Sequence, residues 1–482
     1  MRNGNDGSPA GRQDQETERA MKRPNILILY TDQQRWDALG ANGNSEIRTP
    51  NLDRLSAQGL NYQRFFVQNP VCMPSRVSML SGQYPSQLRI THMGVPVPED
   101  LLTLPGYLRN YGYQTACIGK LHFLPHANRD HREVHPAYGF DHLEVSDEPG
   151  CYEDAYRAWV RHRAPGELDK ISCGLPPAAE VWQGTLHIAD DVAHPEMRGP
   201  GTTAFEAGSD LTHTAFVAEQ TMDYIGKHRD GPFLCISGFY SPHSPWIAPQ
   251  EYLDLYDPAQ LSVPQFPACI EARRGERFGD EALRLAKQGY YAMVSEVDHH
   301  VGRILDCLEE RGIAEDTVVV FTSDHGEYLG EYLRFDKGFP GEDCISRVPM
   351  LIRWPNGIAE PEAIDHIVEA VDIVPTLLQS AAIPLPGRLQ GRPLPTSNDP
   401  EARTRESALL EDTGGKSLRT DRYRYVLRAG GQEQLYDLEA THGQYEDISD
   451  EEQYAETLSE MRGELARRML EMERPLPRTW PY

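Results

Sequence analysis

The chain has 482 residues, of which 39% are hydrophobic and 25% are charged, and its formal net charge is -26. This composition is typical of a globular protein, and the length favours one large domain together with a smaller one. The net charge argues against nucleic acid and against an anionic membrane surface as partners, because both require clustered cations. A local basic pocket for one small anion is compatible with it.

The first 21 residues are polar and contain no apolar segment. We therefore expect residues 1–21 to form a disordered arm rather than a secretory signal. No apolar run in the sequence has the length needed to span a bilayer. The eight cysteines form no C-x-x-C pair, which disfavours a zinc ribbon or a disulfide framework and fits a reducing compartment. These features predict a cytoplasmic protein.

Short apolar, β-branched runs alternate with helical patterns from Pro24 to about Gly391. Continuous apolar strands separated by helices are typical of a parallel sheet covered on both faces. The clearest strands are at 25–32, 114–120, 232–240 and 317–324. The clearest helices are at 49–59, with a threonine N-cap, and at 298–312, which ends on a glycine. The predicted fold class is α/β, with a large mixed, mostly parallel sheet between helices.

Two segments differ from this pattern. Residues 128–215 are rich in Gly, Pro, His and acidic residues and show little periodicity, so we expect long loops of the kind that determine substrate selectivity. Residues 396–482 are predicted to form a small α+β subdomain, with two strands and a Gly-Gly turn at 417–439 and a helix at 451–473. The proline-rich end, 475–482, is expected to pack on another surface, such as a neighbouring subunit of a homo-oligomer.

Polar side chains follow each of the four predicted strands. These groups are Asp32 and Gln33, Lys120 and His122, His243, and Asp324 and His325. Ligands of parallel sheets bind beyond the carboxyl ends of the strands, so we expect these groups to converge. Taken singly, Asp32 is equally typical of a helix cap and His325 of a turn, while Lys120 and Lys337 are typical of surface charges. The functional interpretation depends on the combination.

A converged set of Asp32, Gln33, Asp324 and His325 offers two carboxylates, an amide oxygen and an imidazole. Hard oxygen donors favour Ca²⁺, Mg²⁺ or Mn²⁺, and the nitrogen donor shifts the preference toward Mn²⁺. Zinc is a less distinctive fit without a cysteine ligand. We expect one divalent metal ion, Ca²⁺ or Mn²⁺.

The segment that begins at Cys72 carries the most specific motif. Cys72-x-Pro74-Ser75-Arg76, followed by Leu80 and Gly82, resembles the signature of the sulfatases, in which the cysteine is oxidised to formylglycine. Other motifs of that family stand in the expected order: P-N-I-L-x-x-x-x-D at 24–32, T-P-N-L-D-R-L-x-x-x-G at 49–59, G-K-x-H-F at 119–123, P-H-x-P at 242–245, S-D-H-G-E at 323–327, V-D-I-x-P-T at 371–376 and L-Y-D-L at 435–438. The resemblance implies the fold of the alkaline phosphatase superfamily, with a catalytic domain at 22–395 and a small C-terminal subdomain at 396–482.

Some motif positions depart from the usual pattern. Asp32-Gln33 and Asp324-His325 resemble the branch that contains phosphonate monoester hydrolases and related bacterial arylsulfatases, which are promiscuous between sulfate, phosphate and phosphonate esters. Ser81 and Gln83 stand where the signature usually has a threonine and a second arginine. The Cys-x-Pro-Ser-Arg core is intact.

The resemblance also implies a mechanism. A maturation enzyme oxidises Cys72 to formylglycine, and the hydrate of this aldehyde joins the metal ligands. One geminal hydroxyl, deprotonated on the metal, attacks sulfur and expels the alcohol. Loss of the proton from the second hydroxyl then collapses the covalent sulfo-enzyme hemiacetal and releases sulfate.

Roles for the remaining residues follow from spacing and from the resemblance. Arg76 lies four residues after Cys72, so the two side chains share one helix face, and its guanidinium suits holding the hydrate. By resemblance, Lys120 and Lys337 bind the ester oxygens, and His243 is the general acid for the leaving alcohol. His122 assists the collapse of the hydrate, and His92 contacts the substrate.

Three other functions fit the sequence less well. A cysteine-dependent phosphatase needs C-x₅-R, but Arg76 is at +4 and the residue at +6 is Ser78. A metal-dependent phosphatase with an unmodified nucleophile leaves the Pro-Ser-Arg context unexplained, and a non-catalytic protein of this fold is expected to have lost ligands. We predict arylsulfatase-type hydrolysis of a small sulfated metabolite. Hydrolysis of phosphonate monoesters or phosphate diesters by the same nucleophile is the alternative.

Overall fold

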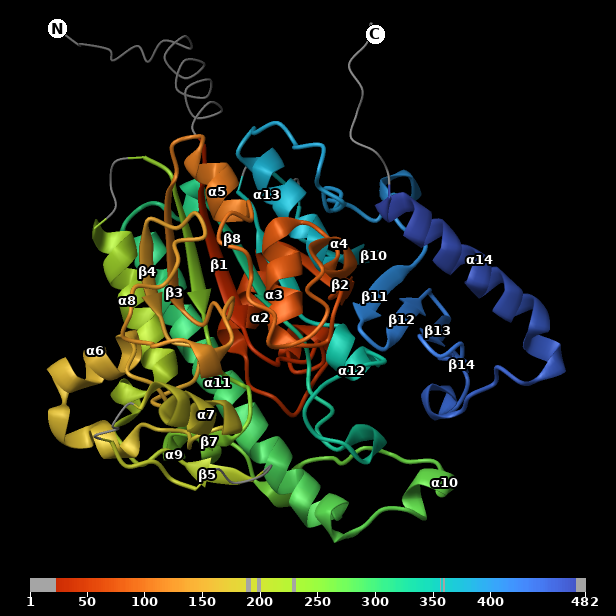
Figure 1. Cartoon of the computed structure of the whole chain (residues 1–482), viewed down its shortest axis with the longest axis horizontal. Coiled ribbons are helices and arrows are strands. Elements are labelled where there is room, and N and C mark those ends of the chain that lie inside the picture. The colour runs from red at the N-terminus through yellow and green to blue at the C-terminus, as the bar shows by residue number, and fades with distance from the viewer. Residues whose placement is uncertain are drawn as a thin grey trace, which may run out of the picture.

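The computed structural model describes residues 23–187, 192–196, 201–227, 231–355, 357–358 and 360–473. The expected N-terminal arm, 1–21, and the proline-rich end, 475–482, lie outside the described residues. The described part contains an eight-stranded sheet between two layers of helices and a second, four-stranded sheet beside it (Figure 1).

The large sheet has the strand order β10-β2-β9-β8-β1-β6-β3-β4. Its strands are β1 (Asn25–Thr31), β2 (Leu60–Phe66), β3 (Gln114–Gly119), β4 (His142–Val145), β6 (Phe233–Gly238), β8 (Thr317–Ser323), β9 (Met350–Arg353) and β10 (Glu362–Glu369). β9 runs antiparallel to β2 and β8, and the other neighbouring pairs are parallel. The predicted mixed, mostly parallel sheet is confirmed, and the four predicted strands lie side by side as β8, β1, β6 and β3.

The central strand β1 shows why these strands are continuous apolar runs. Ile26 and Ile28 pack into one layer of helices, whereas Leu27 and Leu29 pack into the other, because successive side chains point to opposite faces. The first layer contains α3 (Cys72–Ser81), α5 (Leu104–Arg109) and α13 (Ile373–Ser380), and the second contains α2 (Pro50–Ala57), α8 (His213–Lys227) and α11 (Asp280–Glu310). Among the described residues, no helix combines the length and the apolar character that crossing a bilayer requires.

Two helices differ in detail from the prediction. The helix expected at 298–312 is the second half of α11, which begins at Asp280. The first half packs on β7 (Trp246–Ala248), and Gly289 faces Trp246 so closely that a Cβ there would lie 2.9 Å from the tryptophan Cβ. A glycine required by packing weakens the helical sequence signal. Thr49 precedes α2 as predicted, but its hydroxyl donates to Asp53 and accepts from the backbone N–H of Gly40, so it caps no N–H of the helix.

The segment 128–215 contains more regular structure than the long loops expected. It holds β4, α6 (Ala155–Arg163), α7 (Pro177–Leu186), β5 (Thr202–Ala204) and the start of α8. His131 stacks on Tyr152 with ring centroids 3.7 Å apart, and Trp182 meets Tyr152 edge-on at 5.2 Å. Aromatic contacts of this kind have no sequence period, so pattern analysis cannot detect them. Shorter helices elsewhere are α4 (Pro85–Leu88), α9 (Gln250–Leu253), α10 (Ala268–Glu271) and α12 (Asp343–Ser346).

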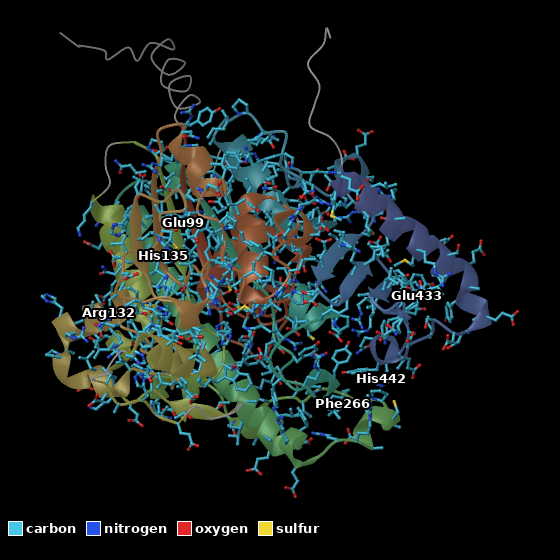
Figure 2. All side chains as sticks on the ribbon, viewed as in Figure 1. Glu99, Arg132, His135, Phe266, Glu433 and His442 are labelled. Carbon is cyan, nitrogen blue, oxygen red and sulfur yellow. The ribbon has the colours of Figure 1, made fainter. Side chains whose placement is uncertain are left out.

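The second sheet is antiparallel and has the order β11-β12-β13-β14, drawn in blue in Figure 1. Its strands are β11 (Ala408–Asp412), β12 (Gly415–Arg419), β13 (Tyr423–Arg428) and β14 (Glu433–Asp437). The predicted Gly-Gly turn joins β13 to β14, and the sheet has two strands more than expected. The apolar face of α14 (Ala455–Met472) packs on this sheet. Figure 2 shows Glu433, at the start of β14, which pairs with Arg462 of α14.

A buried ion network joins this sheet and α14 to the large sheet. Glu369, the last residue of β10, accepts hydrogen bonds from Arg468 of α14 at 2.8 and 3.0 Å and from the backbone N–H of Leu409 at 2.7 Å. Arg405 pairs with Glu369 at 2.7 Å and also with Asp372. Because Glu369 is fully buried, its removal takes this carboxylate away from Arg468 and leaves Arg405 with Asp372 alone.

We therefore predict that Glu369→Ala lowers the free energy of unfolding by about 3–5 kcal/mol, the usual effect of breaking a buried ion pair on one side. Urea denaturation followed by tryptophan fluorescence measures this. Glu406→Ala is the control, because the Glu406 carboxyl is 69% exposed beside Arg403 and should contribute less than about 1 kcal/mol. Equal stabilities of the two variants would contradict the role given to Glu369.

Candidate active site

The predicted site residues lie at the carboxyl ends of adjacent strands. Asp32 and Gln33 follow β1, and Asp324 and His325 follow β8, whose last residue pairs with Thr31. The loops after β3 and β6, on the other side of β1, carry Lys120, His122 and His243. The N-terminus of α3 brings Cys72 to this edge of the sheet, where it contacts His325.

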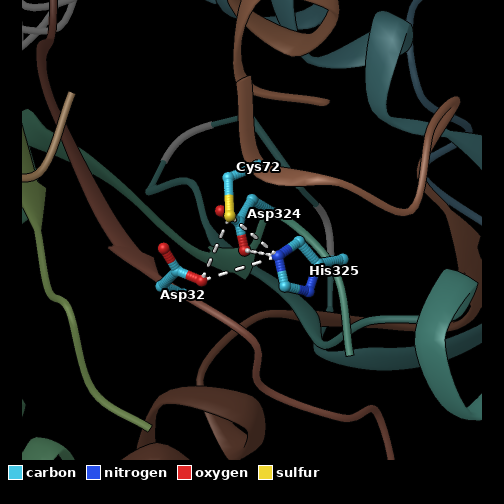
Figure 3. A group of neighbouring side chains, drawn as sticks. All are labelled: Asp32, Cys72, Asp324 and His325. Carbon is cyan, nitrogen blue, oxygen red and sulfur yellow. Dashed lines mark hydrogen bonds and ion pairs between the residues drawn. The ribbon is translucent and has the colours of Figure 1, made fainter. Parts of the chain in front are cut away.

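Asp32, Cys72, Asp324 and His325 form a compact buried cluster (Figure 3). One ligand atom from each of the four lies within 4.8 Å of the others. His325 Nε2 is 3.2 Å from Cys72 Sγ and 3.6 Å from Oδ1 of each aspartate. Burial by itself lowers the pKa of His325, but Asp324 raises it to about 9. The cluster therefore favours a positive charge at its centre.

The outward oxygens of the two aspartates are held by cations. Arg76 Nε donates to Asp324 Oδ2 at 2.7 Å, and Arg76 Nη2 donates to Asp32 Oδ2 at 3.3 Å. Lys120 Nζ lies 2.7 Å from Asp32 Oδ2. Burial raises the pKa of Asp32, but Lys120 and the neighbouring cations hold it well below its usual value. Both Oδ1 atoms thus remain directed toward the cluster.

Arg76 is itself buried and fixed from several sides. Its Nη1 donates to the Lys120 carbonyl at 3.0 Å, and its guanidinium lies 4.6 Å from the centre of the Tyr30 ring. The arginine expected to hold the hydrate therefore orients both aspartates as well.

Lys337 links the cluster to His243. Its Nζ donates to Cys72 Sγ at 3.1 Å and to Gln33 Oε1 at 3.1 Å, and it lies 2.8 Å from His243 Nε2. Burial and the positive charge of Lys337 lower the pKa of His243. His243 Nδ1 lies 2.6 Å from the Ser244 carbonyl, so Nδ1 carries the proton and Nε2 accepts from the lysine.

His122 lies in the loop after β3. Asp147 Oδ1 accepts the backbone N–H groups of Leu121 and His122, at 2.9 and 2.8 Å. The His122 ring stacks on His126 at 4.4 Å, and within the described part of the chain no hydrogen-bond partner reaches its Nδ1. Burial lowers the pKa of His122, and His126 lowers it further. His122 is therefore neutral and has a free ring nitrogen.

His92 is placed differently from the other predicted residues. It is exposed and contacts Thr413, in the turn between β11 and β12, at 3.2 Å. In the part of the chain that the structure describes, no hydrogen bond or ion pair joins His92 to the cluster.

The Sulfatase family model matches residues 24–383, which is more than half of the chain. The chain belongs to the sulfatase family. A second model, "N-sulphoglucosamine sulphohydrolase, C-terminal", matches residues 330–471 of this sulfatase. As a member of this family it is a sulfuric ester hydrolase, and the predicted family and enzyme class are confirmed.

Curated relatives and solved structures span nearly the whole chain. An arylsulfatase of Clostridium perfringens is 29% identical over 475 residues and covers 91% of this chain and 93% of the relative. An ulvan-active sulfatase of Formosa agariphila is 28% identical over 470 residues, covering 93% and 82%. The crystal structure of a phosphonate monoester hydrolase of Agrobacterium radiobacter superposes with a TM-score of 0.75 at 25% identity, covering 93% of this chain and 96% of that one.

Two residues at this edge of the sheet were not predicted from the sequence. Asp147 follows β4, a strand hidden in the segment that was expected to be loops. Glu327 is the last residue of the S-D-H-G-E motif, and its carboxyl accepts a hydrogen bond from Gln33 Nε2. The motif contained the signal for Glu327, whereas only the recognition of β4 as a strand reveals Asp147.

The donor set of this sulfatase fits a hard divalent cation. Two buried carboxylates turn one oxygen each toward the cluster, and His325 adds a nitrogen whose partner atom Nδ1 lies 2.8 Å from the Gly326 carbonyl. Such a carbonyl contact fixes the ring of a metal-binding histidine. Gln33 Oε1, the remaining predicted donor, accepts from Lys337, and oxygen-rich sets with one imidazole suit Ca²⁺ or Mn²⁺.

We predict that Asp324→Asn greatly reduces bound metal, because it removes the charge while an amide oxygen can still accept from Arg76. Loss of a direct ligand should lower the metal affinity by more than the roughly 10- to 100-fold that loss of an outer hydrogen-bond partner causes. Elemental analysis of purified protein and titration of metal-free protein with Mn²⁺ measure this. Asp336→Asn, whose carboxyl is 61% exposed, serves as the control. Unchanged metal content in Asp324→Asn would refute this ligand set.

Proposed function

We propose that this sulfatase hydrolyses sulfate esters of the arylsulfatase type with a nucleophile formed by oxidation of Cys72 to formylglycine. The observation that supports this most directly is the position of Cys72. Its Sγ, which stands for the oxygens of the converted side chain, contacts His325, Lys337 and Asp32. The residue that the motif marks for oxidation is thus the one that completes the donor cluster.

The charges around the cluster suit a monoanionic ester. Arg76, Lys120 and Lys337 carry three positive charges, against two negative charges on the aspartates. Fixed charges act strongly in a buried site because little water screens them. Lys120 and Lys337 are proposed to hold the ester oxygens, whereas Arg76 keeps the two aspartates in place.

A divalent cation held by Asp32, Gln33, Asp324, His325 and the converted Cys72 would polarise the ester and lower the pKa of the attacking hydroxyl. The hydrated aldehyde of the converted side chain supplies a nucleophile whose second hydroxyl allows sulfate to leave without a second attack at sulfur.

Two histidines are proposed to move the protons. His243 protonates the oxygen of the leaving alcohol through Nε2, which first takes up a proton from the ammonium of Lys337, whose Nζ lies 2.8 Å away. His122 takes the proton that is lost when sulfate is released, because it is neutral and its Nδ1 has no partner among the described residues. Each role is typical of imidazole, and each contributes about 10²- to 10⁴-fold to the rate. His92 stays a proposed substrate contact.

We propose that a formylglycine-generating enzyme reaches Cys72 before the chain has folded, because the folded residue is only 1% exposed. We further propose a cytoplasmic enzyme that acts on a small sulfated metabolite and assembles as a homo-oligomer. All eight cysteines are free, which supports a reducing compartment. The division into domains at 22–395 and 396–482 also stays a prediction.

Hydrolysis of phosphonate monoesters or phosphate diesters is the second candidate function. These esters carry a single negative charge, as a sulfate ester does, so the same three cations can hold them. The similarity to the Agrobacterium radiobacter phosphonate monoester hydrolase over 93% of this chain favours the candidate.

The proposed nucleophile predicts a specific chemical form of Cys72. In protein produced together with a formylglycine-generating enzyme, mass spectrometry of the peptide of residues 65–76 should find the aldehyde in place of the thiol. Activity should rise in proportion to the converted fraction, and Cys72→Ala should be inactive. Full activity with an intact thiol would refute the mechanism.

The choice between the two functions predicts an order of rates. With one enzyme preparation, kcat/KM for an aryl sulfate should exceed the values for an aryl phosphonate monoester and an aryl phosphate diester of the same leaving group. Because the three esters release the same alcohol, differences in leaving-group ability do not affect the comparison. The ratio of their kcat/KM values then reports the preference for sulfate, phosphonate or phosphate. A phosphonate preference of several orders of magnitude would overturn the assignment as an arylsulfatase and favour the second candidate.

A further inference from the structure

Glu327 is fully buried beside the cluster, and no role described above uses it. Its carboxyl is surrounded by three N–H donors. Gln33 Nε2 donates to Oε2, and the backbone N–H groups of Leu329 and Asp336 donate to Oε1 at 3.0 and 2.5 Å. Both oxygens of this side chain therefore act as acceptors.

The first consequence concerns the amide of Gln33, which has a donor end and an acceptor end. Glu327 engages the nitrogen, so the oxygen points to the other side, where Lys337 Nζ donates to it at 3.1 Å. A reversed amide would place its NH₂ group against the ammonium and its oxygen against the carboxyl. Two such contacts are costly in a buried site. Glu327 and Lys337 together thus select one amide orientation.

The second consequence concerns the loop that carries Lys337. The two backbone donors to Oε1 come from the two ends of the segment 329–336, and Lys337 is the next residue. The backbone contact from Tyr328 N–H to the Asp336 carbonyl, at 3.1 Å, closes the same loop. Glu327 thereby fixes the point from which Lys337 reaches Cys72 Sγ at 3.1 Å.

We propose that Glu327 is a positioning residue that makes Gln33 present its amide oxygen to the bound cation and that holds the Lys337 loop against the nucleophile. The inference rests on the metal site of the proposed function. Glu327 acts through Gln33 and through the backbone, so its effect is expected first in metal affinity.

The test uses metal-free full-length protein titrated with Mn²⁺ by calorimetry. In Glu327→Gln, the new amide oxygen stays with the two backbone donors, so its NH₂ group faces Gln33. Gln33 must then turn its own oxygen toward position 327 and its nitrogen toward the cation. We expect Mn²⁺ affinity to fall by about 10- to 100-fold, the usual effect of losing an outer partner of a metal ligand. Glu331→Gln in the same loop, where Glu331 pairs with Arg35 at 2.6 Å, should leave the affinity unchanged.

A double-mutant cycle separates this positioning role from a general effect on stability. Gln33→Glu restores an acceptor opposite the amide of Glu327→Gln, whereas in the wild-type background it places two carboxyls in contact. We therefore expect Gln33→Glu to be more favourable for Mn²⁺ binding in the Glu327→Gln background than alone, by roughly tenfold or more. If Glu327→Gln alone does not fold, recovery of folded, Mn²⁺-binding protein in the double variant shows the same coupling.

Additive effects of the two substitutions would overturn the proposal, as would wild-type affinity in Glu327→Gln or a double variant that does not fold. If the wild-type protein itself binds no Mn²⁺, the proposed metal site and this inference both fail. If the wild type binds Mn²⁺ and Glu327→Gln binds it equally well, only this inference fails.

Discussion

Arg76 donates to both Asp32 and Asp324, and the rest of the site depends on this buried pairing. Neighbouring parallel strands are about 4.8 Å apart, so the two aspartates that follow β1 and β8 lie close together. Two carboxylates at that separation repel each other, and each then favours the protonated form. The guanidinium reaches Oδ2 of both, at 3.3 and 2.7 Å, and leaves Oδ1 of both for a cation.

The chain as a whole is acidic, whereas the site contains three cations for an anionic substrate. The net charge of -26 repels an anionic substrate at long range, but solvent ions screen exposed charges over about 8–10 Å. Arg76 and Lys120 are buried and the side chain of Lys337 is only 14% exposed, so at contact distance these three cations outweigh the distributed surface charge. A long polyanion would meet that distributed negative charge, which is why a small anion is the proposed substrate.

The sequence predicted the parts of this arrangement that rest on local patterns. The strands β1, β3, β6 and β8 are apolar runs that end in polar groups, and the order of the sheet places those ends side by side. The parts that rest on tertiary contacts were not predictable. The first half of α11 contains Gly289, a position where the close contact with Trp246 leaves no room for a side chain. β4 is a four-residue edge strand, too short to show a pattern, and Asp147 was hidden with it.

The irregular loops of the site are held by hydrogen bonds from backbone N–H groups to buried carboxylates, which sequence patterns do not predict. At three strand ends or loops a buried carboxylate accepts backbone N–H groups of the segment that carries a site residue. Asp324 Oδ1 accepts from Gln33, Asp147 Oδ1 accepts from His122, and Glu327 Oε1 accepts from the N–H that precedes Lys337. A buried N–H without a partner costs free energy, so each acceptor restricts its loop to one conformation. Helices and strands then need only bring the carboxylates to this edge of the sheet, because the carboxylates fix the loops.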